Sequence, residues 1–508
     1  MYRRIIAGAL AGATVVLTTI AGCAKVDPQP DYRRAEELTT RSTGQQYLFD
    51  PLEREAAERR VEELLRDGLT ADEAAQVALL HNPELQAALY EIGAARADLV
   101  QSGLLSNPTL GLALRLPSAG GLSNIDFDLA QNIADLWQIP ARKRMAARDL
   151  DQTILRIARQ ASAVAAQAKE AFYRASGAAR RLAIARENRE IGRTIVELTE
   201  FRRRAGAGNR LDVNLARGVL LDAELATKRA RLAAESARRA LATVLGLAED
   251  AAAVRLTEPL PTPPAHTLQT ETLIRLAWAE RLDARALRQS VDSARQRLVL
   301  EVRRVIPTFE FGLALERDAR RRVPGRDLLA DTARSSIGAG RLSAPDIQPR
   351  SERKRAKGQD VIIGPMVSLE LPIFDQNQAQ IAKARYELER RLRLLEGLER
   401  TIRQEVREAV DQARTAWEVA RFYRDEVVPQ ASRSLELSRE SYRAGQSSIL
   451  SVLDAERSYL AARDRFAEAM QQAAAAGPLL ERAVGLPMDR LVEAVRRPAS
   501  QPAGGSHP

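Results

Sequence analysis

An internal duplication is the feature that most constrains how this 508-residue chain can fold. The segment NPELQAAL, from Asn82, aligns with RLDARALR, from Arg281, at an offset of 199 residues. The same offset places Pro108 on Pro307. Because repeated sequence folds into repeated supersecondary units, we expect the two halves of the chain to share one architecture.

The second part of each repeat aligns at a larger offset. The tripeptide RAG at 204–206 matches RAG at 443–445, at 239 residues, and this offset also pairs Gly246 with Gly485. The offset grows because the second copy carries an Arg-rich insertion over 317–360. The predicted division is a signal peptide over 1–22, an N-terminal anchor segment over 23–68, a first repeat over 69–247, a linker over 248–267, a second repeat over 268–487 and a disordered tail over 488–508.

Each repeat holds two short segments in which apolar residues alternate with small or polar ones. In TLGLALRL, leucines take every second position from Leu110 to Leu116, and FEFGLAL repeats the pattern from Phe309 to Leu315. A second alternating segment follows in each repeat, at 125–129 and at 367–371. A period of two is the pattern of a β-strand with one apolar face, so the chain is predicted to contain four such strands.

Two environments explain these strands equally well. Strands of about 9–11 residues with one apolar face suit a membrane β-barrel, but a soluble hairpin packed on a core shows the same alternation. Four strands alone cannot close a barrel, and an open sheet edge is not tolerated in lipid. The strands therefore either join strands of other copies in an oligomeric barrel or lie outside the membrane.

Most of the remaining chain is predicted to form long helices. Few helix breakers occur over 141–201, 211–245, 268–305, 376–443 and 448–484. Sixty helical residues span about 90 Å, which is too long for one globular core and implies coiled-coil-like packing. Proline ends helical hydrogen bonding, and four prolines stand where helix and strand are expected to meet: Pro108, Pro140, Pro307 and Pro372.

The N-terminus has the pattern of a secretory signal. Arg3 and Arg4 precede a short apolar run, and the run ends in IAGC at Cys23, the one cysteine of the chain. This ending resembles the bacterial lipobox, in which cleavage leaves a cysteine that is acylated. An aspartate directly after the lipobox cysteine is the usual signal for retention in the inner membrane. Here Ala24 follows Cys23, which favours the outer membrane. The alternative is a plain signal peptide with an incidental thiol.

Composition argues against nucleic-acid binding and against catalysis. The net charge is +10, but arginines alternate with glutamates along the predicted helices, as on a solvated helical surface, and no nucleic-acid-binding motif is present. The three histidines, His81, His266 and His507, have no metal-ligand spacing. No nucleophile-elbow or P-loop motif occurs. We expect no enzyme activity, no cofactor and no metal centre.

Over roughly 69–487 the sequence resembles the TolC-like outer-membrane efflux proteins. The resemblance rests on LTADEAAQVALLHNPELQAAL, LSNPTLGLAL, LPIFDQNQAQIAKAR, YRAGQSSILSVLDAERSYLAA and AVGLP. It implies a mostly α fold with a small β part, in which three protomers each give four strands to a 12-stranded outer-membrane barrel and their helices continue as a periplasmic tunnel. One departure is the first strand-to-helix junction, QIPARKR, which lacks the glycine often found there.

The resemblance also implies a function. The homotrimer would be a passive exit duct of a Gram-negative-type bacterium, held in outer-membrane lipid and fed by a periplasmic adaptor protein and an inner-membrane pump. The cargo would be drugs, metal ions or small toxins. The leucines of the first strand would face lipid, while Gly111, Ala113 and Arg115 would face the lumen or the barrel wall. A type I protein-secretion duct and a non-transporting coiled-coil tether remain as alternatives.

Two kinds of site follow from the resemblance. The adaptor-docking hairpin tips would be formed by Arg204, Ala205, Gly206, Arg443, Ala444 and Gly445. The periplasmic gate would lie just beyond the tips, where the candidates are Asp212, Leu453 and Asp454. Asp454 would form a threefold ring of carboxylates and Leu453 an apolar plug. The alternative is that both acids are solvent-facing or are near-N-terminal residues favoured by the helix dipole.

Overall fold

The computed structural model describes residues 24–116, 123–206, 208–247, 254–262, 269–306, 308–319 and 359–496. The predictions at Cys23 and Pro307 lie outside these residues, as do most of the linker and most of the insertion. The chain divides into two compact units. The smaller unit comprises Leu99–Ala147 and Ser293–Glu389, and the larger comprises the remaining described residues.

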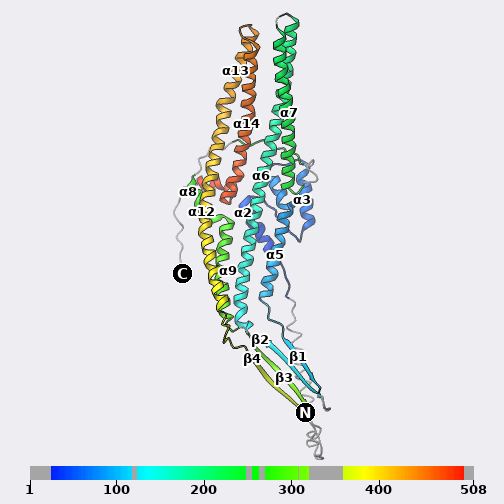
Figure 1. The fold of residues 1–508 in the computed structure, drawn as a ribbon, viewed down its shortest axis with the longest axis vertical. Helices are drawn as coiled ribbons and strands as arrows, with labels where there is room; N and C mark the ends of the chain where they lie inside the picture. Colours follow the sequence, from blue (N-terminus) through cyan, green and yellow to red (C-terminus); the bar gives the residue numbers. More distant parts are fainter. Residues whose placement is uncertain are drawn as a thin grey trace, which may run out of the picture. The chain divides into compact units, whose positions relative to one another are not determined.

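The smaller unit contains a four-stranded antiparallel sheet (Figure 1). Its strands follow the order of the chain: β1 (Thr109–Arg115), β2 (Asn124–Asn132), β3 (Phe309–Ala319) and β4 (Gln359–Leu369). Each repeat supplies one pair of neighbouring strands, and the β2–β3 ladder joins the two pairs. The predicted fold class, mostly α with four strands, is confirmed.

The fourth strand differs from its predicted position. The β3–β4 ladder includes both ends of the predicted insertion, 317–319 and 359–360, and β4 ends at Leu369 rather than Leu371. Residues 361–365 read VIIGP, so apolar and polar residues do not alternate there and the sequence does not indicate the beginning of β4. Pro365 lacks an N–H donor, but β4 is an edge strand, where a missing donor is tolerated.

Parts of four helices complete the smaller unit. They are the ends of α5 (Pro83–Ser102) and α9 (Leu282–Arg303) and the beginnings of α6 (Asp135–Arg204) and α12 (Gln378–Phe422). The prediction that Pro140 marks the border of α6 is wrong, because the helix begins five residues earlier and contains this proline. As the sixth residue of α6, Pro140 lies beyond the first turn, so the helix lacks the backbone hydrogen bond that an N–H at this position would donate to the carbonyl of Leu136. Pro108 directly precedes β1, and Pro372 lies between β4 and α12.

The larger unit consists of helices. Besides the remaining parts of α5, α6, α9 and α12, it contains α2 (Gln29–Thr43), α3 (Arg54–Arg66), α4 (Ala71–His81), α7 (Arg210–Val244), α8 (Thr270–Glu280), a π-helical turn η2 (Tyr423–Val427), α13 (Val428–Arg443), α14 (Ile449–Val484) and α15 (Met488–Arg496). The π turn ends two residues before Pro429, whose missing N–H prevents a regular α-helical hydrogen bond to the carbonyl of Asp425.

The duplication is visible in matching contacts. Asn82, between α4 and α5, donates from Nδ2 to the carbonyl of Val244 at 2.9 Å. Its counterpart Arg281, between α8 and α9, donates from Nη1 to the carbonyl of Ala483 at 3.1 Å. Asn82 and Arg281 are related by the offset of 199 residues, and Val244 and Ala483 by the offset of 239 residues. The predicted continuous helix over 268–305 is two helices, α8 and α9, because the backbone of Arg281 between them is not helical, with ψ at +128°. The Arg281 side chain instead satisfies a carbonyl at the end of α14.

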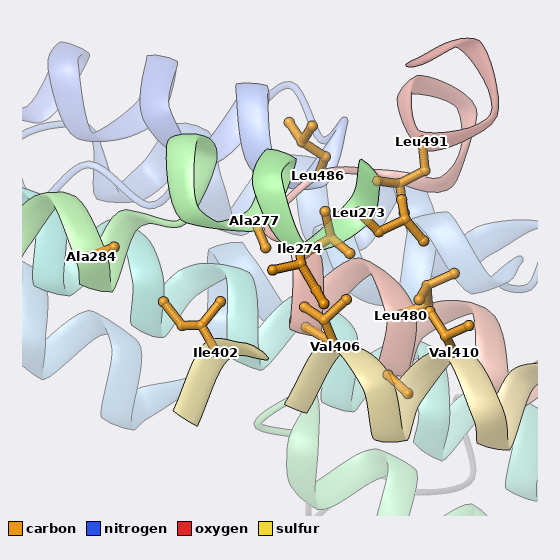
Figure 2. Packing of buried hydrophobic residues seen from close by; sticks show 13 residues of the cluster. Leu273, Ile274, Ala277, Ala284, Ile402, Val406, Val410, Leu480, Leu486 and Leu491 are labelled. Atoms are coloured by element: carbon orange, nitrogen blue, oxygen red, sulfur yellow. The ribbon is translucent and has the colours of Figure 1, made fainter. Parts of the chain in front are cut away.

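One core cluster of the larger unit joins helices of the second repeat (Figure 2). Its 13 buried residues come from α8, α9, α12, α14 and the residues that follow α14. Leu491 of α15 is fully buried in it. The prediction of a disordered tail is wrong for Met488–Arg496, because burying a leucine side chain contributes about 1.5–3 kcal/mol to folding. None of the helices in the described ranges is long and apolar enough to cross a membrane.

Candidate functional site

One face of the sheet is apolar and exposed. The ladder register places Leu112 beside Phe127, Phe127 beside Leu315, and Leu315 beside Ile363, so a continuous apolar row crosses all four strands. Leu112 is 71% exposed and Ile363 52%. Further exposed residues on this face are Leu110, Leu114, Leu129, Phe311, Leu313, Val361, Val367 and Leu369. A contiguous apolar surface of this kind must be covered by lipid or by another chain.

The opposite face of the sheet is acidic. Asp126 lies between Ala113 and Glu316 in the ladder, and Arg115 of β1 reaches Asp126 at 2.7 Å. Asp128 lies opposite Gly111, where an added Cβ would come within 2.3 Å of its carboxylate. Glycine at 111 therefore makes room for the aspartate. Glu310 has the same position parity as Glu316, so acids outnumber Arg115 on this face and it attracts cations.

A buried carboxylate fixes the junction of strand and helix. Asp135, at the start of α6, accepts hydrogen bonds of 2.6 Å from both the backbone N–H and the hydroxyl of Ser106, and one of 2.9 Å from Arg142. Burial raises the pKa of Asp135, but the Ser106 hydrogen bonds and the Arg142 charge outweigh it and hold this pKa below its ordinary value. Sequence reasoning missed this residue because it placed the helix start after Pro140.

Replacing Asp135 by asparagine is expected to destabilise the protein by about 1–3 kcal/mol, since a buried acceptor of three hydrogen bonds loses its charge. Because the folded-state pKa of Asp135 is lowered, its contribution is present above the unfolded-state pKa and is lost as the pH falls through the folded-state pKa. Chemical denaturation of wild type and D135N at pH 7 and near pH 3 measures this. A difference in unfolding free energy that is equal at both pH values would contradict it.

Two helical hairpins end in glycine turns. The α6–α7 turn contains Gly206 with φ +76°, and the α13–α14 turn contains Gly445 with φ +73°. Only glycine adopts this left-handed conformation without strain. A Cβ added to either glycine would meet nothing within 4 Å. The backbone conformation, and not a lack of space, therefore favours glycine at both turns.

The two hairpins pack on each other next to these turns. A buried cluster combines Ile195 of α6 with residues of α7, α13 and α14. The guanidinium of Arg202 lies over the ring of Tyr442, with 4.3 Å between its carbon and the ring centroid. The tip residues predicted from the sequence, 204–206 and 443–445, thus lie at the ends of two hairpins that support each other.

The three gate candidates have different surroundings. Asp212 forms a capping box: Asn209 Oδ1 accepts from the Asp212 N–H at 2.8 Å, and the Asp212 carboxylate accepts from the Asn209 N–H at 3.4 Å. This favours the helix-start interpretation of Asp212. Leu453 is only 4% exposed and belongs to the cluster between the hairpins, so the prediction of an apolar plug at Leu453 is wrong. Asp454 is exposed and keeps its place as a candidate.

Within the described part of the chain, no three His, Cys, Asp or Glu side chains form a group that could hold a metal ion.

His81 is the last residue of α4, and a Cβ on Gly246 would come within 2.4 Å of the His81 carbonyl oxygen. The close approach of Gly246 explains why this glycine, with φ +79°, follows α7. His81 thus belongs to the packing between α4 and the end of α7.

Comparison with known proteins agrees with this arrangement. The chain is 28% identical over 428 residues to Protein CyaE of Bordetella pertussis, covering 78% of this chain and 80% of that protein. It is 23% identical over 427 residues to the cobalt-zinc-cadmium resistance protein CzcC of Cupriavidus metallidurans, covering 82% and 90%. The crystal structure of the outer membrane protein VceC from Vibrio cholerae superposes with a TM-score of 0.61 at 17% identity, covering 84% of this chain and 98% of that one.

The family model described as outer membrane efflux protein matches residues 74–247 and 273–486, one segment in each repeat. These segments contain both pairs of strands and both helical hairpins. The match covers more than half of the chain, and the fold agrees with it. This chain is therefore a member of the outer membrane efflux protein family.

Proposed function

We propose that three copies of this protein form an outer-membrane exit duct, with a barrel of twelve strands and helices that extend into the periplasm. The observation that carries the proposal is the sheet, which is apolar and exposed on one face and acidic on the other. Within the described chain, β1 and β4 each leave one edge unpaired. Because lipid does not tolerate an unpaired edge, pairing β1 of one copy with β4 of the next closes the sheet.

The duct serves as the last part of a tripartite efflux system. A periplasmic adaptor binds the tips at 204–206 and 443–445, and an inner-membrane pump supplies the energy, since the duct itself is passive. The acidic face of the sheet lines the lumen in this arrangement and favours positively charged cargo. CzcC, a relative of this chain, is named for resistance to cobalt, zinc and cadmium. Metal ions are therefore the first cargo to test, ahead of drugs and other small toxins.

A type I protein-secretion duct is the alternative function, and a coiled-coil tether without transport is a weaker one. Transport assays in a deletion strain separate them. Accumulation of cobalt, zinc or cadmium in the cells indicates an efflux duct, while loss of a secreted protein from the medium indicates a secretion duct. A tether leaves both unchanged.

We further propose that Cys23 carries a lipid anchor. Replacing Cys23 by alanine is expected to abolish incorporation of a labelled fatty acid while leaving part of the protein in the outer membrane, because the barrel also holds it there. Labelling of wild type and C23A with an alkyne-tagged palmitate measures this. Unchanged labelling of C23A would contradict the anchor.

Asp454 is proposed to face the axis of the duct near its periplasmic end. Three carboxylates brought together there would favour cation passage, so D454A is expected to lower the cation-to-anion permeability ratio of single channels several-fold. The control is D212N, because the Asp212 carboxylate is engaged in a helix cap. Equal permeability ratios in D454A and wild type would place the selective ring elsewhere.

A further inference from the structure

A cavity of about 580 Å³ lies between the two helical hairpins of the larger unit. Residues of α6, α7 and α14 line it. The proposed duct function makes no use of this cavity, and neither the sheet nor the glycine turns contribute to it. Its volume lies within the range of sites that bind small molecules.

Apolar residues, many of them alanines, form more than half of the walls, and charged and polar side chains form the rest. From α6 come Ala185, Gly192 and Ile195, and α7 and α14 contribute further alanines. These positions recur at helical spacing, so each helix turns one small-residue face toward the cavity. Where such faces meet without large side chains, space remains between the helices. The cavity is therefore a place for a compact apolar body.

One buried carboxylate oxygen in this cavity has no hydrogen-bond partner. Glu456 of α14 lines the cavity and is 1% exposed. Its Oε2 accepts from Arg439 Nη2 at 2.7 Å, but its Oε1 is buried without a partner. A buried acceptor oxygen without a donor is unfavourable, so a ligand that donates a hydrogen bond to Oε1 gains free energy on binding.

A second acceptor lines the same cavity. Oδ1 of Asn188, on α6, is also buried without a partner. Three arginines also line the cavity: Arg181 makes two hydrogen bonds to Asp464, of 2.8 and 2.9 Å, and Arg229 and Arg457 are exposed. Two unpaired oxygens repel an anion and attract a group with several N–H donors.

We propose that this cavity binds a small organic cation, an ammonium or amidinium group on a compact apolar body. The N–H donors pair with Glu456 and Asn188, and the apolar body lies against the alanine walls of α6, α7 and α14. Such a ligand bridges the two hairpins. The proposal is independent of the proposed duct function, since it concerns the ligand-binding property of one protomer.

Isothermal titration of the purified full-length protein with benzylammonium tests the proposal. Benzyltrimethylammonium is the matched probe, because it keeps the charge and the ring but has no N–H donor. We expect saturable binding of benzylammonium at one site per protomer, and binding of the trimethyl compound at least about tenfold weaker, as a lost charge-assisted hydrogen bond predicts. Equal affinity for both probes, or no binding of benzylammonium, would overturn the proposal.

Three variants locate the site. E456Q removes the charge and is expected to weaken benzylammonium binding by about tenfold or more. A226L fills the cavity from an exposed position and should abolish binding even if E456Q folds poorly. E187Q is the control, because Glu187 also accepts from an arginine, Arg463 at 2.8 Å, but does not line the cavity. Unchanged binding in A226L, or an equal loss in E187Q, would place the probe elsewhere.

Discussion

Replacing Leu112 by arginine is expected to prevent stable insertion of the protein into the outer membrane. Leu112 lies in the apolar row that crosses all four strands, and it is 71% exposed in the protomer. An arginine on the lipid face of a membrane barrel costs about 2–4 kcal/mol near the midplane. In a threefold assembly this cost arises once in every copy, so the combined effect is comparable with the whole stability of a typical domain.

The next residue in the chain provides a matched control. Ala113 lies on the opposite face of the sheet, beside Asp126, and an arginine there meets the acidic side chains of that face. A113R is therefore expected to insert like wild type. Membrane fractionation on a sucrose gradient, followed by urea extraction, compares the two variants. If L112R and A113R are both retained in the outer membrane to the same extent, the apolar face is not in contact with lipid.

Bulky residues at both glycine turns are expected to abolish export while the amount of assembled protein in the outer membrane stays the same. In the double variant G206F/G445F the new side chains project into open space, because nothing lies within 4 Å of either Cβ position. The cost to folding is limited to the left-handed backbone, roughly 1–2 kcal/mol at each position. A partner that approaches the turns closely would instead meet a phenyl ring at both contacts.

The double variant G206N/G445N separates backbone strain from obstruction. Asparagine tolerates the left-handed conformation and is much smaller than phenylalanine. Metal or drug susceptibility of cells, together with the amount of assembled protein in the outer membrane, measures both effects. Export that is lost in the phenylalanine variant and kept in the asparagine variant indicates docking at the turns. Loss of assembled protein in both variants would mean that the glycines only serve folding.

Local patterns in the sequence predicted much of the fold. The alternation from Leu110 to Leu116 identified the face of β1, because side-chain direction in a strand depends only on residue spacing. The repeat offsets predicted matching elements, and the contacts of Asn82 and Arg281 with equivalent carbonyls bear this out. The prediction that the chain is not an enzyme is confirmed by its membership in a family of transport channels.

Features that depend on tertiary contacts were missed or misplaced. From the sequence, Leu453 could face the axis of the duct. Packing determines which side of α14 faces the other hairpin, and it buries Leu453 between the two hairpins. The burial of Leu491 orders α15, although the flanking composition suggests disorder. Asp135 gives no local signal beyond being an acid near a helix start, because its role comes from Ser106, which lies 29 residues earlier.

The central claim is that three copies close one barrel around a water-filled passage. The most direct measurement is single-channel recording in a planar bilayer, on protein whose mass in detergent has been determined by light scattering. We expect a mass of three chains, stepwise conductance, and a cation preference that falls in the variant D126N/D128N, which neutralises two acids on the polar face of the sheet. A monomer that stays in solution without detergent and conducts no ions would contradict the account.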